Sequence, residues 1–185
     1  MYIKKATDSE NGYDSYTLLD WITDVGDGHM EESQTLLASY GADLVALVGS
    51  KAAFGTSTCG LGWVPKTFVD SSRSYVAYSS SCLPSGRLWA HEIAHTQGCH
   101  HDRITALQSD PTFVGYGHCW EDLAKAKTDC TCYKSAMVYE CDTPKYGCTK
   151  CTGGKLYMAN PNVKESGNPT GTSNACMFIR IAIVT

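Results

Sequence analysis

A group of histidines near the middle of the chain has the spacing of a metal site. His91 and His95 are four residues apart, so on an α-helix their imidazoles lie on one face and can reach a single ion. Glu92 follows His91 directly, so on a helix it lies beside the face that carries the two histidines. From there its carboxylate can reach a water held by the ion and act as a general base. The spacing therefore predicts two metal ligands and a catalytic base on one helix.

A third histidine, His101, completes the pattern H-E-x-x-H-x-x-G-x-x-H. At roughly 100° per residue, a continued helix would point His101 about 240° away from His95, so the chain has to turn first. Gly98 allows this turn, because glycine adopts a positive φ at little steric cost and commonly ends helices. Three imidazoles leave the fourth tetrahedral position of a zinc ion open to water, which is the arrangement of a catalytic zinc site.

Two neighbouring side chains compete for the same role. His100 precedes His101 and is an alternative ligand, although the spacing favours His101 and leaves His100 exposed or outside the ligand set. Cys99 lies inside the motif and could bind zinc as a thiolate. We expect instead that Cys99 is buried in a disulfide that fixes the loop after the helix.

The complete string resembles the zinc signature of the metzincin metalloendopeptidases. Asp102, directly after the third histidine, is similar to the adamalysin-like, or reprolysin-type, branch of that family. The resemblance implies one catalytic Zn²⁺ held by His91, His95 and His101, with Glu92 as general base. Gly98 and Asp102 would be structural residues of this site.

The segment S-A-M-V-Y, which ends at Tyr139, is similar to the Met-turn of the same family and follows the motif by about 35 residues. The resemblance implies that Met137 is a structural floor to the site and not a ligand. The S-x-M-x-Y form is closer to astacins and serralysins, in which the tyrosine steadies the tetrahedral intermediate. Tyr139 is therefore a candidate catalytic residue, with a packed core tyrosine as the alternative.

The apolar pattern predicts the elements that position these residues. We predict helices over 13–25, 30–40 and 87–97, and strands over 43–48 and 74–81. In the second helix, Asp27 would be a cap, Gly41 the stop, and Leu36, Leu37 and Tyr40 would face the core.

The segment 59–65 is short and closed by a proline, which suits a strand at the edge of a sheet. In metzincins the edge strand at this place binds an extended substrate through main-chain hydrogen bonds. The resemblance implies this substrate-binding role for Gly60, Leu61, Gly62 and Trp63. An ordinary hairpin arm is the alternative.

The order of strands and helices indicates an α/β (α+β) fold for the first half of the chain. The resemblance implies a metzincin-like zincin, in which a mostly parallel twisted sheet and an active-site helix lie above a small, loop-rich and disulfide-rich lower subdomain. We expect a single catalytic domain over 1–185, with an upper part over about 1–98 and a lower part over about 99–185. From the comparison with the family, we expect about two strands and one helix to be absent from the N-terminal part of this sequence.

The cysteine content indicates an oxidising compartment. Ten cysteines in 185 residues are consistent with five disulfides and hence with a secreted protein. A second, structural zinc site is an alternative for the C-x-C and C-x-x-C pairs Cys130, Cys132, Cys148 and Cys151. Residues 1–21 lack the apolar core of an export signal. We therefore expect either a signal and pro-segment upstream in a longer precursor, or a fragment.

The composition excludes other classes of protein. A net charge of −4 with scattered lysines and arginines gives no electrostatic footprint for nucleic acid. No run of apolar residues is long enough to span a membrane. Calcium binding is left open, since nothing in the sequence indicates it, and so is the oligomeric state.

The sequence therefore predicts a secreted zinc endopeptidase that acts on protein or peptide substrates. Two alternatives remain open. One is a catalytically impaired binding or adhesion module that keeps a structural zinc, which the intact Glu92 argues against. The other is a zinc-dependent amidase that acts on a non-protein substrate.

Overall fold

The computed structural model describes residues 3–5, 13–55, 57–65, 71–102, 105, 119–121, 132–139, 153–165 and 167–171 of the 185. The chain divides into two compact units, Met1–Thr96 and Gln97–Thr185, and each is described by itself. That the two make up one catalytic domain stays a prediction.

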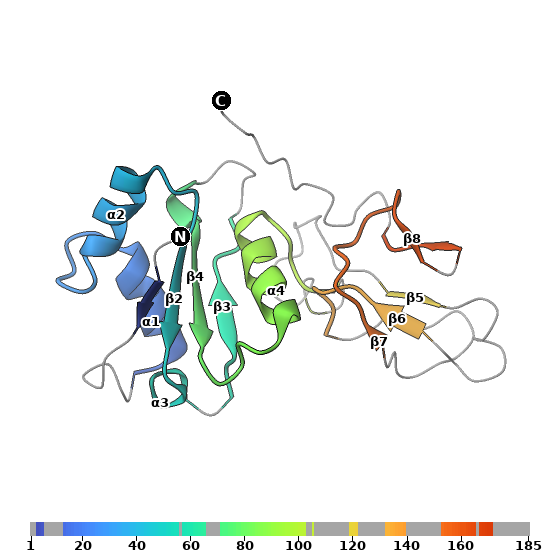
Figure 1. Cartoon of the computed structure of the whole chain (residues 1–185), viewed down its shortest axis with the longest axis horizontal. Helices are drawn as coiled ribbons and strands as arrows, with labels where there is room; N and C mark the ends of the chain where they lie inside the picture. Colours follow the sequence, from blue (N-terminus) through green and yellow to red (C-terminus); the bar gives the residue numbers. More distant parts are fainter. Residues whose placement is uncertain are drawn as a thin grey trace. The chain divides into compact units, whose positions relative to one another are not determined.

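A four-stranded sheet forms the centre of the first unit (Figure 1). Its strands lie in the order β1-β2-β4-β3. They are β1 (Ile3–Lys5), β2 (Val45–Gly49), β3 (Gly60–Gly62) and β4 (Tyr75–Ser79). Strands β1, β2 and β4 are parallel, whereas β3 pairs antiparallel with β4. The described part of this unit therefore has the predicted mixed α/β architecture with a mostly parallel sheet.

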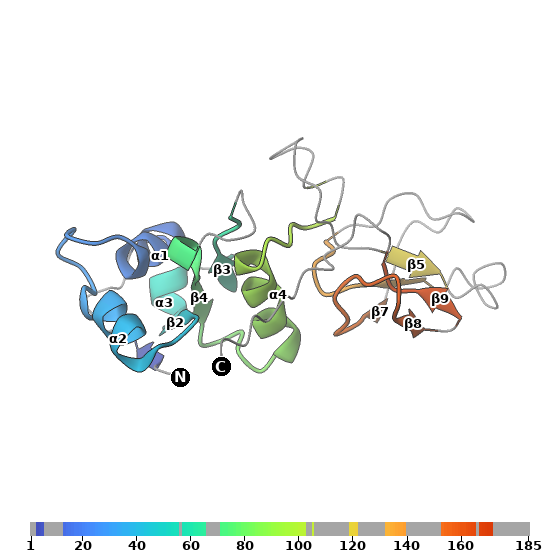
Figure 2. The same ribbon diagram turned by 90° about the horizontal axis from the view of Figure 1, so that it is seen from above.

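Helices cover both faces of the sheet, which explains why β4 is buried along its whole length. Figure 2 shows α1 (Ser15–Thr23) and α4 (Gly86–Thr96) on opposite sides of β2 and β4. Successive residues of a strand point to opposite faces, so the two strands supply two separate core clusters. The strand residues are Leu47, Tyr75 and Ala77 in the cluster with α1, and Ala46, Val76 and Tyr78 in the cluster with α4.

The first helix begins at a side-chain cap. The Asp14 carboxylate accepts a hydrogen bond of 2.9 Å from the backbone N–H of Thr17, one of the donors that a helix start leaves without a partner. Leu18, Leu19 and Ile22 then bury one face of α1 against the sheet. The prediction of a helix within 13–25 is confirmed.

Helix α2 (Glu32–Tyr40) ends at Gly41, which has a φ of 57°, as the sequence predicted. The prediction of Asp27 as its cap is wrong. The Asp27 carboxylate instead accepts a hydrogen bond of 2.8 Å from the backbone N–H of His29, and the residue before the helix is Glu31. Glu31 Oε1 accepts hydrogen bonds from two backbone N–H groups of the loop before it, so the loop closes in front of the helix.

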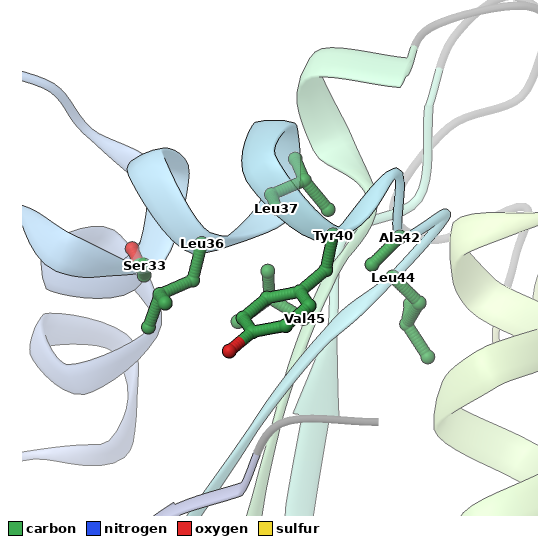
Figure 3. Close-up of a pocket in the computed structure, with 7 residues that line it drawn as sticks. All are labelled: Ser33, Leu36, Leu37, Tyr40, Ala42, Leu44 and Val45. Carbon is green, nitrogen blue, oxygen red and sulfur yellow. The ribbon is translucent and has the colours of Figure 1, made fainter.

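The prediction that Tyr40 faces the core is also wrong, since 73% of this residue is exposed. Tyr40 is the last residue of α2, where the chain turns away at Gly41. Leu37 packs against the core cluster of α1. Tyr40, Leu36 and Leu37 line a pocket of about 410 Å³ between α2 and the start of β2 (Figure 3).

Three short elements of the first unit have no counterpart in the sequence prediction. They are strand β1, helix α3 (Lys51–Phe54) and the 3₁₀ turn η2 (Ser71–Arg73). Ser50 caps α3 by accepting a hydrogen bond from the backbone N–H of Ala53 at 3.2 Å. Each element has three or four residues, too few to produce a periodic apolar pattern.

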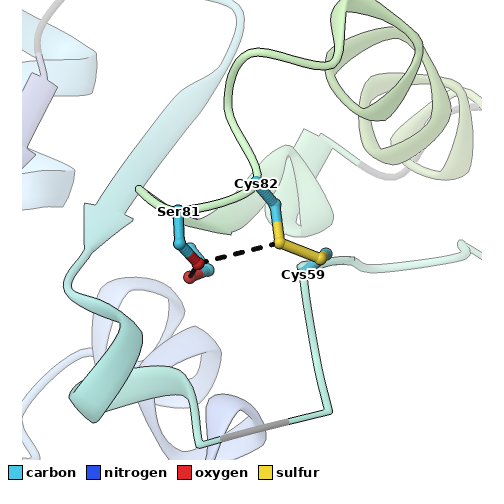
Figure 4. The surroundings of a disulfide bond; sticks show 4 residues. Cys59, Ser81 and Cys82 are labelled. Carbon is cyan, nitrogen blue, oxygen red and sulfur yellow. Dashed lines mark hydrogen bonds between the residues drawn. A yellow bond between two sulfur atoms is a disulfide. The ribbon is translucent and has the colours of Figure 1, made fainter.

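A disulfide joins Cys59 and Cys82 across the sheet edge (Figure 4). Cys59 precedes β3 and Cys82 follows β4, and the Cys59 carbonyl accepts a hydrogen bond of 2.8 Å from the backbone N–H of Ser79. The Ser81 hydroxyl lies 3.9 Å from the Cys82 sulfur. The start of β3 is therefore held to the end of β4 by a covalent bond as well as by the strand pairing.

The described part of the second unit consists of small sheets joined by irregular chain. Strands β5 (Cys119–Glu121), β6 (Cys132–Lys134) and β7 (Gly153–Gly154) form one sheet, and β8 (Lys164–Glu165) pairs with β9 (Asn168–Pro169). Lys155 forms an ion pair of 2.7 Å with Glu165 and lies over the ring of Tyr133.

Several predictions fall on residues outside those described. Cys130, Cys148 and Cys151 of the alternative zinc set are among them, and the side chain of Cys132 is likewise not described. Cys99 is buried, and its pairing stays a prediction. In the described part of the chain, no helix combines the length and the apolar character needed to cross a membrane.

Candidate metal centre

Helix α4 carries the first two histidines and is fixed to the sheet by its other face. Leu88 and Trp89 pack against the cluster of Ala46, Val76 and Tyr78. The Tyr78 hydroxyl donates a hydrogen bond of 3.1 Å to the backbone carbonyl of Trp89, and the two rings are 4.2 Å apart. This packing fixes the rotation of α4 about its axis and hence the direction of its histidines.

The three predicted histidines converge. His91 and His95 are buried, with ring centroids 4.8 Å apart and ring planes at 88° to each other. One ligand atom from each of His91, His95 and His101 can be chosen so that all lie within 4.8 Å of one another. Imidazole nitrogens that share a tetrahedral zinc ion lie about 3.3 Å apart. Three neutral imidazoles are also ligands that Zn²⁺ commonly takes in proteins, so the chemistry of this donor set fits Zn²⁺.

The turn after α4 has the geometry that the third histidine requires. Gly98 has a φ of 86°, a conformation that residues with a side chain rarely adopt. The backbone N–H of His101 donates a hydrogen bond of 2.8 Å to Nδ1 of His100. His100 therefore uses a ring nitrogen within the turn, and the histidine cluster contains His101 in its place.

Glu92 is buried, with 4% of the residue exposed. Burial raises the pKa of the Glu92 carboxyl from 4.5 to about 8, because removal from water disfavours the charged form. A divalent cation held beside it by His91 and His95 would favour the carboxylate and lower this pKa. Such a carboxyl can exchange a proton near neutral pH, as a general base must.

Strand β3 runs directly against this carboxylate. A Cβ atom placed on Gly60 would lie 2.8 Å from Oε1 of Glu92, and one on Gly62 would lie 2.5 Å from the backbone oxygen of Glu92. Among the described residues, β3 is one of the two edge strands of its sheet, and β1 is the other. The position at an edge is the one predicted for a strand that binds substrate.

Two residues predicted to bind substrate direct their side chains into the core. Leu61 and Trp63 pack against the cluster around α1. The Trp63 indole N–H donates a hydrogen bond of 2.8 Å to the Thr23 hydroxyl, and the Arg73 guanidinium lies 4.5 Å from the Trp63 ring centre. What these positions can offer a substrate is therefore their main chain.

In the second unit, the predicted Met-turn is a buried turn. Met137 has none of its surface exposed, and the same is true of Ser135, Ala136 and Val138. The backbone N–H of Val138 donates to the carbonyl of Ser135 at 3.2 Å, and the N–H of Ala136 donates to the carbonyl of Tyr157 at 2.9 Å. Met137 is therefore a buried residue of a turn whose neighbouring backbone groups are hydrogen-bonded.

Tyr139 and Asp102 connect this turn to the segment of the third histidine. Tyr139 is 55% exposed, and its ring centre lies 4.0 Å from that of His101. The buried Asp102 carboxylate accepts a hydrogen bond of 3.1 Å from the backbone N–H of Tyr139. Asp102 also accepts hydrogen bonds from the backbone N–H and hydroxyl of Thr105. The high exposure of Tyr139 does not fit the alternative of a packed core tyrosine.

Sequence reasoning missed some residues that support the site. Thr105 binds the Asp102 carboxylate, and an Asp followed three residues later by a Thr is a recurrent local pairing that could have indicated it. Tyr78 supports α4 through the Trp89 carbonyl, and no local pattern indicates that contact.

Comparison with known proteins identifies the family of this chain. The model of metallo-peptidase family M12B, reprolysin-like, matches residues 2–102, which is more than half of the chain. The match contains all three histidines of the cluster and ends at Asp102. No curated protein and no solved structure matches the chain.

Proposed function

Because the chain belongs to the reprolysin-like metallopeptidases of family M12B, we propose that it is a zinc-dependent endopeptidase that hydrolyses peptide bonds of proteins. The observation that carries this proposal is the convergence of His91, His95 and His101. Glu92, buried on the same helix as two of these histidines, supplies the base that such a site needs.

In this proposal, His91, His95 and His101 would hold Zn²⁺ through one ring nitrogen each. When bound, the ion would supply a water with a pKa of roughly 7 and a positive charge that polarises the scissile carbonyl. Glu92 takes the proton that this water loses as its oxygen forms a bond to the carbonyl carbon. Glu92 then gives the proton to the amine nitrogen as the peptide C–N bond breaks.

The remaining site residues act on this step from other positions. The Tyr139 hydroxyl would donate a hydrogen bond to the carbonyl oxygen as that oxygen becomes negative, a role that its exposure and its ring contact with His101 support. Gly98 and Asp102 would fix the segment of His101. The main chain from Gly60 to Trp63 would pair with an extended substrate at the sheet edge.

We also propose that the protein is secreted. The disulfide between Cys59 and Cys82 supports this, because such bonds persist in oxidising compartments. Mass analysis of the extracellular form, with and without reduction, would count the disulfides. A fully reduced protein purified from the cytosol would contradict the proposal.

The proposed activity is tested by zinc analysis together with casein cleavage on the zinc-loaded 185-residue chain, with and without a chelator. We expect about one zinc per chain and cleavage that the chelator stops and added zinc restores. Zinc without cleavage would favour the binding module. Cleavage of small amides but not of casein would favour the amidase, and a chain that binds no zinc would refute the proposal.

A further inference from the structure

Gly60 lies where a side chain would displace the carboxylate of Glu92. A Cβ atom at this position would lie 2.8 Å from Cγ, 2.8 Å from Oε1 and 3.1 Å from Cδ of Glu92. Cβ atoms essentially never approach other heavy atoms to less than 3.0 Å, so one of the two residues would have to move. The atoms that Gly60 faces are those of the flexible side chain and not of the helix backbone.

The strand itself is not free to move away. Before Gly60, the disulfide from Cys59 and the hydrogen bond from Ser79 to the Cys59 carbonyl hold the start of β3. On the other side of Gly60, the indole N–H of Trp63 donates a hydrogen bond to the hydroxyl of Thr23. Between these anchors β3 is paired with β4. A side chain at position 60 would therefore shift the Glu92 carboxylate and leave the strand in place.

Gly62 provides an internal comparison two residues further along the same strand. A Cβ atom there would lie 2.5 Å from the backbone oxygen of Glu92 and 3.2 Å from Cγ1 of Val76. The helix backbone and a buried core residue cannot give way as a side chain can. Gly62 therefore sets how closely α4 approaches the sheet edge, whereas the three atoms nearest to a Cβ at Gly60 all belong to the side chain of Glu92.

We propose that Gly60 is a positioning residue for catalysis, because its lack of a side chain leaves the space that holds the Glu92 carboxylate in its working position. This inference rests on the proposed function, in which Glu92 transfers the proton. It assigns Gly60 a role beyond offering its main chain to a substrate.

The first test is the kinetics of Gly60→Ala in the zinc-loaded chain. Displacement of a catalytic group by about 1 Å can lower the rate about 100-fold, so we expect kcat to fall by about 10-fold to 100-fold. KM and the zinc content should stay near those of the unchanged chain. Gly86→Ala is the matched control, because a Cβ atom at Gly86 would meet nothing within 4 Å. It should keep full activity.

The second test asks whether the effect passes through Glu92. In a Glu92→Gln background the residual rate no longer depends on the carboxylate, so Gly60→Ala should lower it no further. An equal fall in kcat in both backgrounds would overturn the proposal. Full activity of Gly60→Ala in the otherwise unchanged chain would overturn it as well.

The third test measures thermal unfolding and needs no activity. Gly60→Ala should lower Tm by about 2–4 °C in the unchanged chain, and should leave it equal or higher in Glu92→Ala, where the opposing atoms are gone. Gly62→Ala should lower Tm in both backgrounds. If the zinc-loaded chain proves inactive, the proposed function fails, while this comparison still decides the Gly60 contact. Equal shifts of Tm for Gly60→Ala in both backgrounds would refute that contact.

Discussion

At the scale of single residues, Glu92 is the side chain on which the proposed chemistry depends most directly. Glu92→Gln keeps the shape and removes the proton acceptor, so we expect kcat to fall at least about 100-fold with zinc content unchanged. Casein hydrolysis and metal analysis on the same samples would check this. Glu32→Gln, at an exposed position of α2, is the control. Near-normal cleavage by Glu92→Gln would exclude it as the base.

The raised pKa of Glu92 predicts a pH dependence of stability in the metal-free protein. Between pH 4.5 and about 8 the folded chain keeps a proton on Glu92 that the unfolded chain releases. The free energy of unfolding should therefore decrease as the pH rises through this window, by a few kcal/mol in all.

The measurement is thermal unfolding of the metal-free chain at pH 5 and pH 8, for the unchanged protein and for Glu92→Gln. The difference in stability between the two proteins at each pH does not include the titration of the histidines, because both proteins contain them. We expect the variant to gain stability relative to the unchanged protein as the pH rises. A constant difference between the two would contradict the raised pKa.

Site residues could be predicted where the chain itself brings them together. His91, His95 and His101 lie within eleven consecutive positions, so helical periodicity and one glycine were sufficient to predict their convergence. The contact between Gly60 and Glu92 joins positions 32 residues apart and depends on how α4 packs on the sheet edge. No spacing rule contains that information.

At the scale of elements, the disulfide between Cys59 and Cys82 should stabilise the pairing of β3 with β4. It joins residues separated by 23 positions, and removing such a constraint costs about 3 kcal/mol. We expect the double Cys→Ser variant to unfold at a Tm roughly 6–12 °C lower. Calorimetry would measure it, with Ser81→Ala as a control that keeps the bond. An unchanged Tm would show that strand pairing alone holds β3.

The Asp102 carboxylate should stabilise the turn that contains Met137. Asp102→Ala removes the acceptor for the backbone N–H groups of Tyr139 and Thr105, so we expect a loss of roughly 2–3 kcal/mol. Thermal unfolding would measure this loss. Asp102→Asn keeps one acceptor oxygen and should lose less. If both variants were as stable as the unchanged protein, the hydrogen bonds would have no structural role.

Element prediction succeeded where apolar periodicity ran for nine residues, as in α1, and where the spacing of His91 and His95 required a helix, as in α4. It failed where a long-range partner decides the structure. β1 is a strand of three residues because it pairs with β2, some forty positions away. The cap of α2 was assigned wrongly because Glu31 reaches back to the loop and Asp27 bonds within it.

At the scale of the whole molecule, the mixed α/β class followed from the order of strands and helices, and the family from the motif. The packing on the two faces of the sheet could not be predicted from the sequence. Strands β2 and β4 are apolar on both faces, so they lack the alternation of apolar and polar residues that shows which face is buried. The exposure of Tyr40 could not be predicted either. It results from the position of Tyr40 at the end of α2, which the apolar periodicity does not show.

The three histidines also lie in one continuous segment, which runs from α4 through the turn at Gly98 to His101. Chelation by such a piece closes only two short loops, so it sacrifices little chain entropy. In a peptide of residues 86–102, the helical part is the 11 residues of α4, which are too few to form a stable helix alone. We expect zinc to induce helical circular dichroism in it. His101→Ala should raise the zinc concentration needed for this response at least about tenfold, since even the loss of a group that only supports a ligand costs about 10–100-fold in metal affinity. If zinc left the circular dichroism of the peptide unchanged, the histidines would need the folded sheet in order to bind the metal. If the peptide does become helical with zinc, the newly made chain could bind the metal before the sheet forms, and the metal site would then nucleate the folding of the surrounding chain.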